Sequence, residues 1–259
     1  MSSRSHLAMT TPFGAALLLL LTWTTGDDPL PRTAPSTLDI CSELAEARSS
    51  ADDPIRAAEA SSLLLNPRDP WFGRQAPERF QLCLLTSAGP MLLESRREWA
   101  PHGVDRFYNL VTAGYYDDSR IFRVVEDRWA QFGIHGNPEV ASTWREESIP
   151  DDPPGLSNER GTLAFAFAVP DGRTTQVFFN LGDNSSTLDE EPFVPIARII
   201  SGQEVLDRIH SGYGETAGGG IRAGNQDPLF EGGNAFLDEH FPELDRILAA
   251  VVVTPGSGL

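Results

Sequence analysis

Residues 121–136 read IFRVVEDRWAQFGIHG, and the rest of the chain is best understood from this stretch outward. An apolar, β-branched run carries a single arginine, Arg123, and a second mostly apolar run carries a glutamine, Gln131. Two strands joined by a polar turn at residues 126–127 would place both polar side chains in one neighbourhood. An unpaired buried guanidinium is very costly, so Arg123 needs a reason to be there. These residues alone leave two interpretations open: a structural ion pair with a carboxylate, or a functional site.

The composition of the chain excludes several classes of protein. Its 259 residues are 40% hydrophobic, which is enough for a core and argues against wholesale disorder. The formal net charge of −17 argues against nucleic-acid backbones and anionic membranes as main partners, because both require a basic footprint. All 20 cationic side chains are Arg, so chemistry that needs a lysine, such as a P-loop or a Schiff base, is excluded.

The N-terminal part of the chain divides into two segments. Residues 1–26 combine a positive charge at Arg4 with a short apolar run, which predicts a signal peptide and an extracytoplasmic location, periplasmic or secreted. An uncleaved membrane anchor is the alternative. Residues 27–77 contain a Pro-rich linker and two short helices.

The two cysteines, Cys41 and Cys83, favour a disulfide over a metal site. Neither belongs to a CxxC pair, and the five histidines are scattered, so no metal site is predicted. An even number of cysteines in an oxidising compartment predicts a bond that ties an N-terminal helix to the first strand. Two separate buried thiols are the alternative.

Residues 78–255 have the pattern of a mainly β domain. Alternating apolar residues predict a hairpin over 80–84 and 91–94, followed by a helix that stops at Gly114. Residues 139–155 are acidic and Pro-rich and residues 212–233 are Gly-rich, so both are predicted to be loops. Short strands with two widely separated helices predict a closed antiparallel barrel with helical caps. The further predicted strands are 161–168, 175–180, 194–200 and 244–253, and the second helix is 203–210.

Four blocks of this domain follow one another in the chain: DRFYNLVTAGYYDDSRIFRVV, WAQFGIHG, GTLAFAFA and TTQVFFNLGDNSSTLD. In this order and spacing they resemble the cyclophilin family of peptidyl-prolyl cis-trans isomerases, over about residues 80–253. The resemblance implies an eight-stranded barrel capped by two helices, and it implies isomerisation of X-Pro bonds. It does not cover residues 1–66.

The resemblance also assigns roles to individual positions of this chain. Arg123 matches the catalytic arginine, and Gln131 matches the glutamine that supports it. Phe178 matches the aromatic of the proline pocket, and Leu188 matches its aliphatic wall. The complete set of substrate-binding positions is Phe122, Trp129, Ala166, Phe167, Ala168, Gln176, Phe178, Thr187, Leu188 and Phe193.

Several positions depart from the residues usual in the family. Phe122 stands in place of a His, Phe167 in place of an Asn, and Thr187 in place of an aromatic, usually Trp. Arg128 stands where the proline pocket usually has an aromatic, and we interpret Trp129 beside it as a replacement wall. Two functions therefore stay open: a prolyl isomerase that assists the folding of exported proteins, or a peptide-binding module of the same fold with weak or no turnover.

The residue types suit rotation about an X-Pro bond. Amide resonance sets a barrier of ~18–20 kcal/mol, and no covalent bond breaks, so no nucleophile, metal or cofactor is expected. In the twisted amide the prolyl nitrogen regains its lone pair, and a guanidinium donates to it more strongly than to the planar ground state. The expected partners are proline-containing peptides and unfolded proteins, without nucleic acid, and with a membrane only through an N-terminal anchor.

Overall fold

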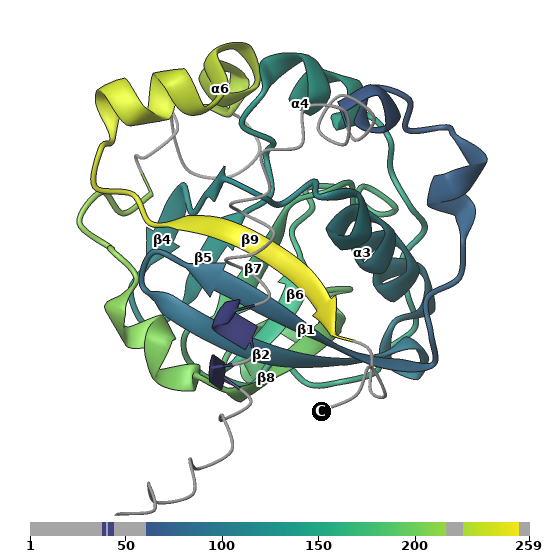
Figure 1. Ribbon diagram of the computed structural model, residues 1–259. Coiled ribbons are helices and arrows are strands. Elements are labelled where there is room, and N and C mark those ends of the chain that lie inside the picture. Colours follow the sequence, from purple (N-terminus) through teal and green to yellow (C-terminus); the bar gives the residue numbers. More distant parts are fainter. Residues whose placement is uncertain (1–37, 40, 44–60, 216–224, 254–259) are drawn as a thin grey trace, which may run out of the picture. The chain divides into compact units, whose positions relative to one another are not determined.

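The computed structural model describes residues 38–39, 41–43, 61–215 and 225–253 (Figure 1). All of them belong to one compact unit, Pro35–Leu259. The predicted signal segment and the linker up to residue 37 lie outside the described residues. Of the two predicted N-terminal helices, residues 38–39, 41–43 and 61–64 are described, and all of these are helical. Within the described ranges, no helix is both long and apolar enough to span a bilayer.

A single curled antiparallel sheet dominates the described residues. Its strands are β1 Arg79–Thr86, β2 Gly89–Arg96, β3 Ser119–Arg120, β4 Arg123–Val125, β5 Trp129–Phe132, β6 Thr162–Phe165, β7 Val177–Asn180, β8 Pro195–Ser201 and β9 Arg246–Val253. Their spatial order is β3-β9-β1-β2-β8-β6-β7-β5-β4. Only Ile121 and Phe122 separate the two edge strands, β3 and β4, along the chain. The sheet therefore curls until its two edges come close together.

The mainly β prediction is confirmed, but the strand count is not the expected eight: the sheet of the described residues has nine. The predicted hairpin is β1–β2, in which Leu82 pairs with Leu93. The strand predicted over 161–168 ends at Phe165, as β6. Beyond it the backbone N–H of Ala166 still donates to the carbonyl of Gln176, the residue before β7, at 2.9 Å, and the ladder ends there.

Helix α3, Pro101–Ala113, lies beside the curled sheet (Figure 1), and its apolar residues pack into the main core. It begins with Pro101 in its first turn, where a missing N–H costs no hydrogen bond, and it ends at Gly114, whose φ of 82° suits glycine. Its apolar face, with Val104, Phe107 and Leu110, belongs to the main core together with strand residues. The described residues also contain the short 3-10 helices η1 Pro70–Gly73, η2 Arg97–Trp99 and η3 Gln203–Arg208.

Two segments predicted to be loops contain helices instead. Helix α4, Pro138–Trp144, begins after Asn137, whose side chain accepts a hydrogen bond from the Glu139 N–H. Helix α6, Asp227–His240, contains a kink at Gly233, where φ is 55°. A further short helix, α5, spans Ser185–Leu188. The prediction failed because Pro, Gly and acidic residues mask the apolar positions of α4 and α6.

Helices α4 and α6 lie side by side (Figure 1) and form a second apolar cluster beside the main core. This cluster is assembled from residues far apart in the chain, so no local pattern reveals it. Its buried members are Phe122, Ile134, Ala141, Leu229, Phe230 and Leu237.

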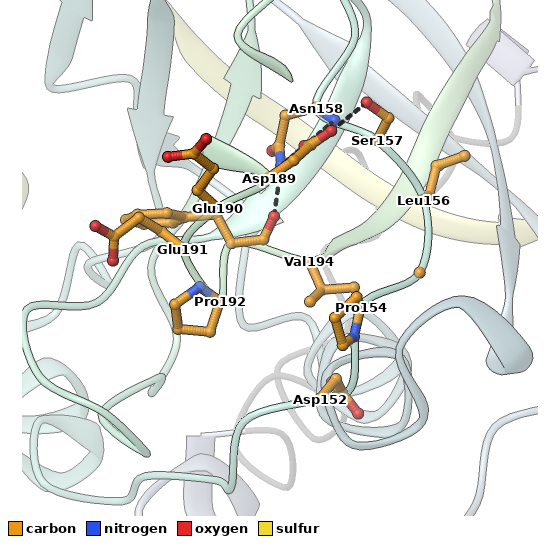
Figure 2. A pocket seen from close by; sticks show the side chains of 12 residues that line it. Asp152, Pro154, Leu156, Ser157, Asn158, Asp189, Glu190, Glu191, Pro192 and Val194 are labelled. Atoms are coloured by element: carbon orange, nitrogen blue, oxygen red, sulfur yellow. Dashed lines mark hydrogen bonds between the residues drawn. The ribbon is translucent and has the colours of Figure 1, made fainter. Parts of the chain in front are cut away.

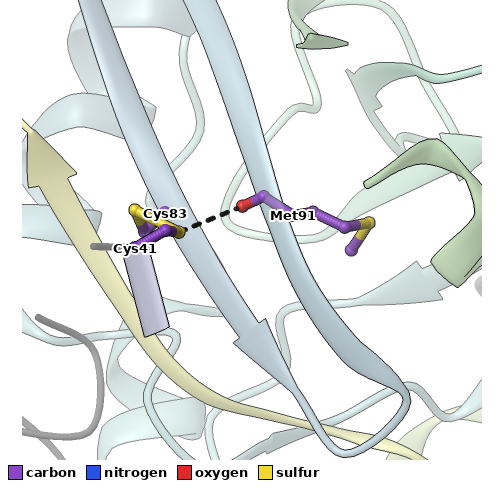
Figure 3. The surroundings of a disulfide bond; sticks show 3 residues. All are labelled: Cys41, Cys83 and Met91. Carbon is purple, nitrogen blue, oxygen red and sulfur yellow. Dashed lines mark hydrogen bonds between the residues drawn. A yellow bond between two sulfur atoms is a disulfide. The ribbon is translucent and has the colours of Figure 1, made fainter. Parts of the chain in front are cut away.

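The predicted disulfide is confirmed: Cys41 and Cys83 are bonded, and their Cα atoms lie 5.4 Å apart (Figure 3). The Cys41 sulfur also lies 3.7 Å from the carbonyl oxygen of Met91 on β2. Both cysteines are buried together with Leu92, so the bond fastens the helical residues around position 41 to the outside of β1 and β2.

Thiol titration of the unfolded, unreduced protein should therefore find no free thiol. Because 42 residues separate the two cysteines, the loop that the bond closes should contribute about 2–4 kcal/mol to the free energy of unfolding. Denaturant unfolding with and without reductant measures that difference. Two titratable thiols, or identical midpoints in both conditions, would contradict the assignment.

Candidate active site

One cavity of about 860 Å³ gathers the residues that the sequence predicted. Eleven of the twelve predicted site residues line it. They come from β4, β5, β7, the segment after β6 and the segment around α5, which lie far apart in the chain. They are Arg123, Trp129, Gln131, Ala166, Phe167, Ala168, Gln176, Phe178, Thr187, Leu188 and Phe193.

Arg123 and Gln131 face each other across the β4–β5 hairpin. They form a register pair, and Arg123 Nη1 donates to Gln131 Oε1 at 2.9 Å. Gln131 Nε2 in turn donates to Gln176 Oε1 at 2.7 Å. The amides of Gln176 and Gln226 then pair reciprocally, at 2.8 and 3.1 Å. Three glutamines thus form a continuous chain that begins at the guanidinium.

The guanidinium of Arg123 has two further neighbours. Its Nη2 donates to Glu215 Oε1 at 2.7 Å, and its Cζ lies 5.0 Å from the centroid of the Trp129 ring. Only 11% of the Arg123 side chain is exposed. Its Nε is buried and finds no hydrogen-bond partner among the described residues. Arg123 is therefore a mostly desolvated cation whose terminal nitrogens are held from two directions.

The apolar side of the cavity is built from aromatic rings. Phe178 on β7 is buried, and its ring meets the Phe193 ring edge-on at 5.8 Å. The Phe167 ring lies against Phe193 at a centroid distance of 4.2 Å. Leu188, at the end of α5, completes this wall. The result is an apolar surface beside a cation, which suits a ring such as that of proline next to a polar amide.

Phe122 is the one predicted site residue that the structure places elsewhere. Only 1% of it is exposed, and it belongs to the apolar cluster under α4 and α6. Its position between β3 and β4 explains the error, since neighbouring residues of an extended chain point to opposite sides. Arg123 enters the cavity, and Phe122 therefore points away from it.

Arg128 does not enter the cavity either. It is exposed at the β4–β5 turn, and its Cζ lies 5.2 Å from the Trp129 ring. Trp129 lines the cavity, as the interpretation of it as a replacement wall requires. The guanidinium that stands at a proline-pocket position in the sequence thus leaves the apolar wall intact.

Sequence reasoning missed eight lining residues. Glu215 and Gln226 flank residues 216–224, and both reach the polar network from a region predicted to be a loop. Phe230 comes from α6, which was not predicted. No local signal marks these residues, because only the long-range fold brings them to the cavity. The others are Arg145, Glu146, Gly172, Thr174 and Glu191.

A second cavity, of about 430 Å³, adjoins the first through Glu191 and Phe193 (Figure 2). The Asp189 side chain points to Ser157 and Asn158, and accepts hydrogen bonds from both (Figure 2). Burial acts to raise the pKa of Asp189, but the hydrogen bonds from Ser157 and Asn158 outweigh it and lower that pKa. The Asp189 carboxylate therefore stabilises the loop that precedes β6.

Comparisons with known proteins agree with this geometry. A family model described as cyclophilin type peptidyl-prolyl cis-trans isomerase/CLD matches residues 82–228, more than half of the chain. A peptidyl-prolyl cis-trans isomerase of Streptomyces antibioticus is 32% identical over 134 residues, which cover 49% of this chain and 80% of that protein. Peptidyl-prolyl cis-trans isomerase A of Dickeya dadantii is 28% identical over 169 residues, which cover 63% of this chain and 87% of that protein.

Solved structures support the same fold. The crystal structure of a cyclophilin type peptidyl-prolyl cis-trans isomerase of Cryptosporidium parvum matches with a TM-score of 0.51 at 17% identity. The match covers 68% of this chain and 99% of that chain. This chain belongs to the family of cyclophilin-type peptidyl-prolyl cis-trans isomerases.

Thr187 leads to a prediction about inhibition by cyclosporin. It lines the cavity but is exposed, and its hydroxyl donates to the Asn184 carbonyl at 3.1 Å. The usual aromatic of the family adds apolar area and an indole N–H for this drug, so we expect weak inhibition of the wild type. At ~25 cal/mol per Å² of apolar area, Thr187→Trp should tighten inhibition by roughly two orders of magnitude. Inhibition titrations of both proteins measure this; tight inhibition of the wild type, or no gain in the mutant, would contradict it.

Proposed function

We propose that this cavity catalyses rotation about X-Pro peptide bonds, with Arg123 as the residue that stabilises the twisted amide. One observation carries the proposal: a mostly desolvated guanidinium, fixed by Gln131 at 2.9 Å, lies in a cavity with an aromatic wall. As the amide rotates, its nitrogen becomes pyramidal and basic, and an N–H of Arg123 donates to it. The same donation is weaker in the planar ground state, so it lowers the barrier.

The other lining residues hold the substrate. Phe178, Leu188 and Trp129 enclose the proline ring, and Phe193 supports Phe178 edge-on. The backbone of residues 166–168, which follows β6 and lines the cavity, binds the extended peptide. Gln176 also lines the cavity, and it fixes the side-chain amide of Gln131 by accepting a hydrogen bond from it. No group in this scheme forms a covalent bond with the substrate.

A peptide-binding module with weak or no turnover is the second candidate function of this cavity. One observation favours it: the bulky Phe167 ring lines the cavity and lies against Phe193 with the ring centroids 4.2 Å apart. A protease-coupled assay, in which cleavage requires the trans X-Pro bond, separates the two. If the domain accelerates the slow phase, which is the cis-to-trans isomerisation of the X-Pro bond, the result supports an isomerase. If the peptide binds but this phase is not accelerated, the result supports a binding module.

The clients of this enzyme are proposed to be exported proteins. The charged and apolar pattern of residues 1–26 supports a signal peptide; residues 27–77 are proposed as a linker with N-terminal helices, and residues 78–255 as the isomerase domain. A disulfide between Cys41 and Cys83 is consistent with an oxidising, extracytoplasmic compartment. Intact mass of the natively exported protein tests this: a start near Asp27 supports it, and retention of residues 1–26 supports a membrane anchor.

The domain is further proposed to act as a closed eight-stranded barrel with helical caps. Because β3 and β4 are separated by two residues and form the two edges of the sheet, they count as one interrupted strand. Joining them turns nine strands into eight and brings the sheet back on itself.

A further inference from the structure

Glu215 contacts the catalytic guanidinium, although rotation about a peptide bond does not require a carboxylate. Its Oε1 accepts a hydrogen bond from Arg123 Nη2 at 2.7 Å, across 92 residues of chain. We propose that Glu215 is a positioning residue of the isomerase: its carboxylate fixes the Arg123 guanidinium in the orientation that stabilises the twisted amide. This proposal rests on the role of Arg123 proposed above.

The need for Glu215 follows from a count of the donors of Arg123. A guanidinium carries five N–H groups and cannot lose its charge. In Arg123, Nη1 donates to the neutral amide of Gln131, Nη2 donates to Glu215, and the buried Nε has no partner in the part of the chain that the structure describes. Without Glu215, a cation that is 11% exposed would keep only a neutral partner. A buried charge without compensation is unfavourable, so Arg123 would turn toward solvent.

The remaining contacts hold the guanidinium against Glu215 rather than away from it. The centroid of the Trp129 ring lies 5.0 Å from Arg123 Cζ. This cation–π contact disfavours movement of the guanidinium away from the ring. Gln131 cannot turn freely, because Gln176 accepts from its amide and is itself paired with Gln226. Among the described residues, Glu215 is the one carboxylate that pairs with Arg123.

Glu215 and Gln226, which flank residues 216–224, both take part in this arrangement. Glu215 precedes them and holds the guanidinium, while Gln226 follows them and holds the far end of the glutamine chain. Gln226 is buried, and its amide pairs with Gln176 through two hydrogen bonds. The region between η3 and α6, which lies outside the four blocks of family resemblance, thus supplies two of the contacts that organise the active site.

A carboxylate that pairs with a catalytic arginine can have either of two effects. It can orient the N–H donors toward the substrate, or it can block them. Here the contact uses Nη2 alone, and Arg123 still lines the cavity together with Glu215. Each terminal nitrogen carries a second N–H that these contacts leave for a substrate. A donor fixed before the reaction contributes more than one that must reorganise, so we assign orientation rather than blocking.

Glu215→Gln tests the assignment, because it keeps the size of the side chain and removes its charge. We expect kcat/KM on a proline-containing peptide to fall about 10- to 100-fold, the range of a lost charge-assisted hydrogen bond. The loss should lie in kcat with KM little changed, since the affected contact acts in the transition state. Glu215→Asp keeps the charge and should recover part of the activity. The matched control is Glu204→Gln, which removes the same charge from an exposed position on η3 and should leave kcat/KM unchanged.

A spectroscopic signal separates positioning from a general structural role. The buried Nε–H of Arg123, assigned by its absence in Arg123→Ala, should give a sharp proton–nitrogen resonance in the wild type and a broadened or lost one in Glu215→Gln. Thermal unfolding of both proteins should be similar. Activity of Glu215→Gln equal to or above the wild type would overturn the proposal, and so would an unchanged Nε–H resonance. An inactive wild type would instead refute the proposed function, so the two failures are distinguishable.

Discussion

Arg123→Ala is expected to lower kcat/KM on a proline-containing peptide by at least about 100-fold while the domain remains folded. In the proposed mechanism the guanidinium is the donor that stabilises the twisted amide, and removal of one preorganised donor typically costs about 10²–10³ in rate. The fold should persist because backbone hydrogen bonds, not this side chain, set the register of Arg123 with Gln131. The loss should therefore appear in catalysis and not in stability.

Arg128→Ala is the matched control for this experiment. Arg128 belongs to the same hairpin and lies 5.2 Å from the same Trp129 ring, but it is exposed and does not line the cavity. It should retain wild-type kcat/KM in the protease-coupled assay. Equal activity of Arg123→Ala and Arg128→Ala would show that the guanidinium in the cavity is not the catalytic group.

Asp152→Ala is expected to reduce the free energy of unfolding by about 3–5 kcal/mol, the usual cost of breaking a buried ion pair. Asp152 and Arg173 are 0% and 1% exposed in their side chains, and Asp152 Oδ2 accepts from Arg173 Nη1 at 2.9 Å. The same carboxylate accepts the backbone N–H groups of His102 and Gly103, both at 2.8 Å, at the start of α3. Its removal leaves a buried cation and two helix N–H groups without this partner.

The comparison for Asp152 is the surface pair of Asp207 and Arg160, at 2.7 Å, in which Asp207 is 67% exposed. Asp207→Ala should cost less than about 1 kcal/mol, because solvent screens an exposed pair. Urea unfolding of the two variants and the wild type measures both differences. Similar values for Asp152→Ala and Asp207→Ala would contradict the importance given to the buried pair.

The sequence was sufficient for those parts of the fold that a local pattern encodes. Alternating apolar residues identified the β1–β2 hairpin, and Gly114 identified the end of α3. Helices α4 and α6 were missed, because each hides its apolar face among Pro, Gly and acidic residues and is stabilised by the cluster they share. The count of nine strands arises because Ile121 and Phe122 separate β3 from β4. Such a break is set by backbone hydrogen-bond geometry and not by a local sequence pattern.

The candidate site likewise contains contacts that the sequence predicts and contacts that depend on the complete fold. The Arg123–Gln131 contact was predictable, since a short hairpin places residues eight apart opposite each other. Phe122 was misplaced because its neighbour in an extended segment points to the other side. Glu215 and Gln226 were not predictable, since their contacts span 92 and 50 residues and depend on the complete fold.

The central claim is that this cavity accelerates rotation about an X-Pro bond, and exchange NMR on a proline-containing peptide tests it most directly. At a protein concentration far below that of the peptide, the account predicts exchange cross-peaks between the cis and trans forms within a second. The uncatalysed process takes tens to hundreds of seconds. Peptide resonances that shift on binding but show no cis–trans exchange would contradict the account and leave a peptide-binding module.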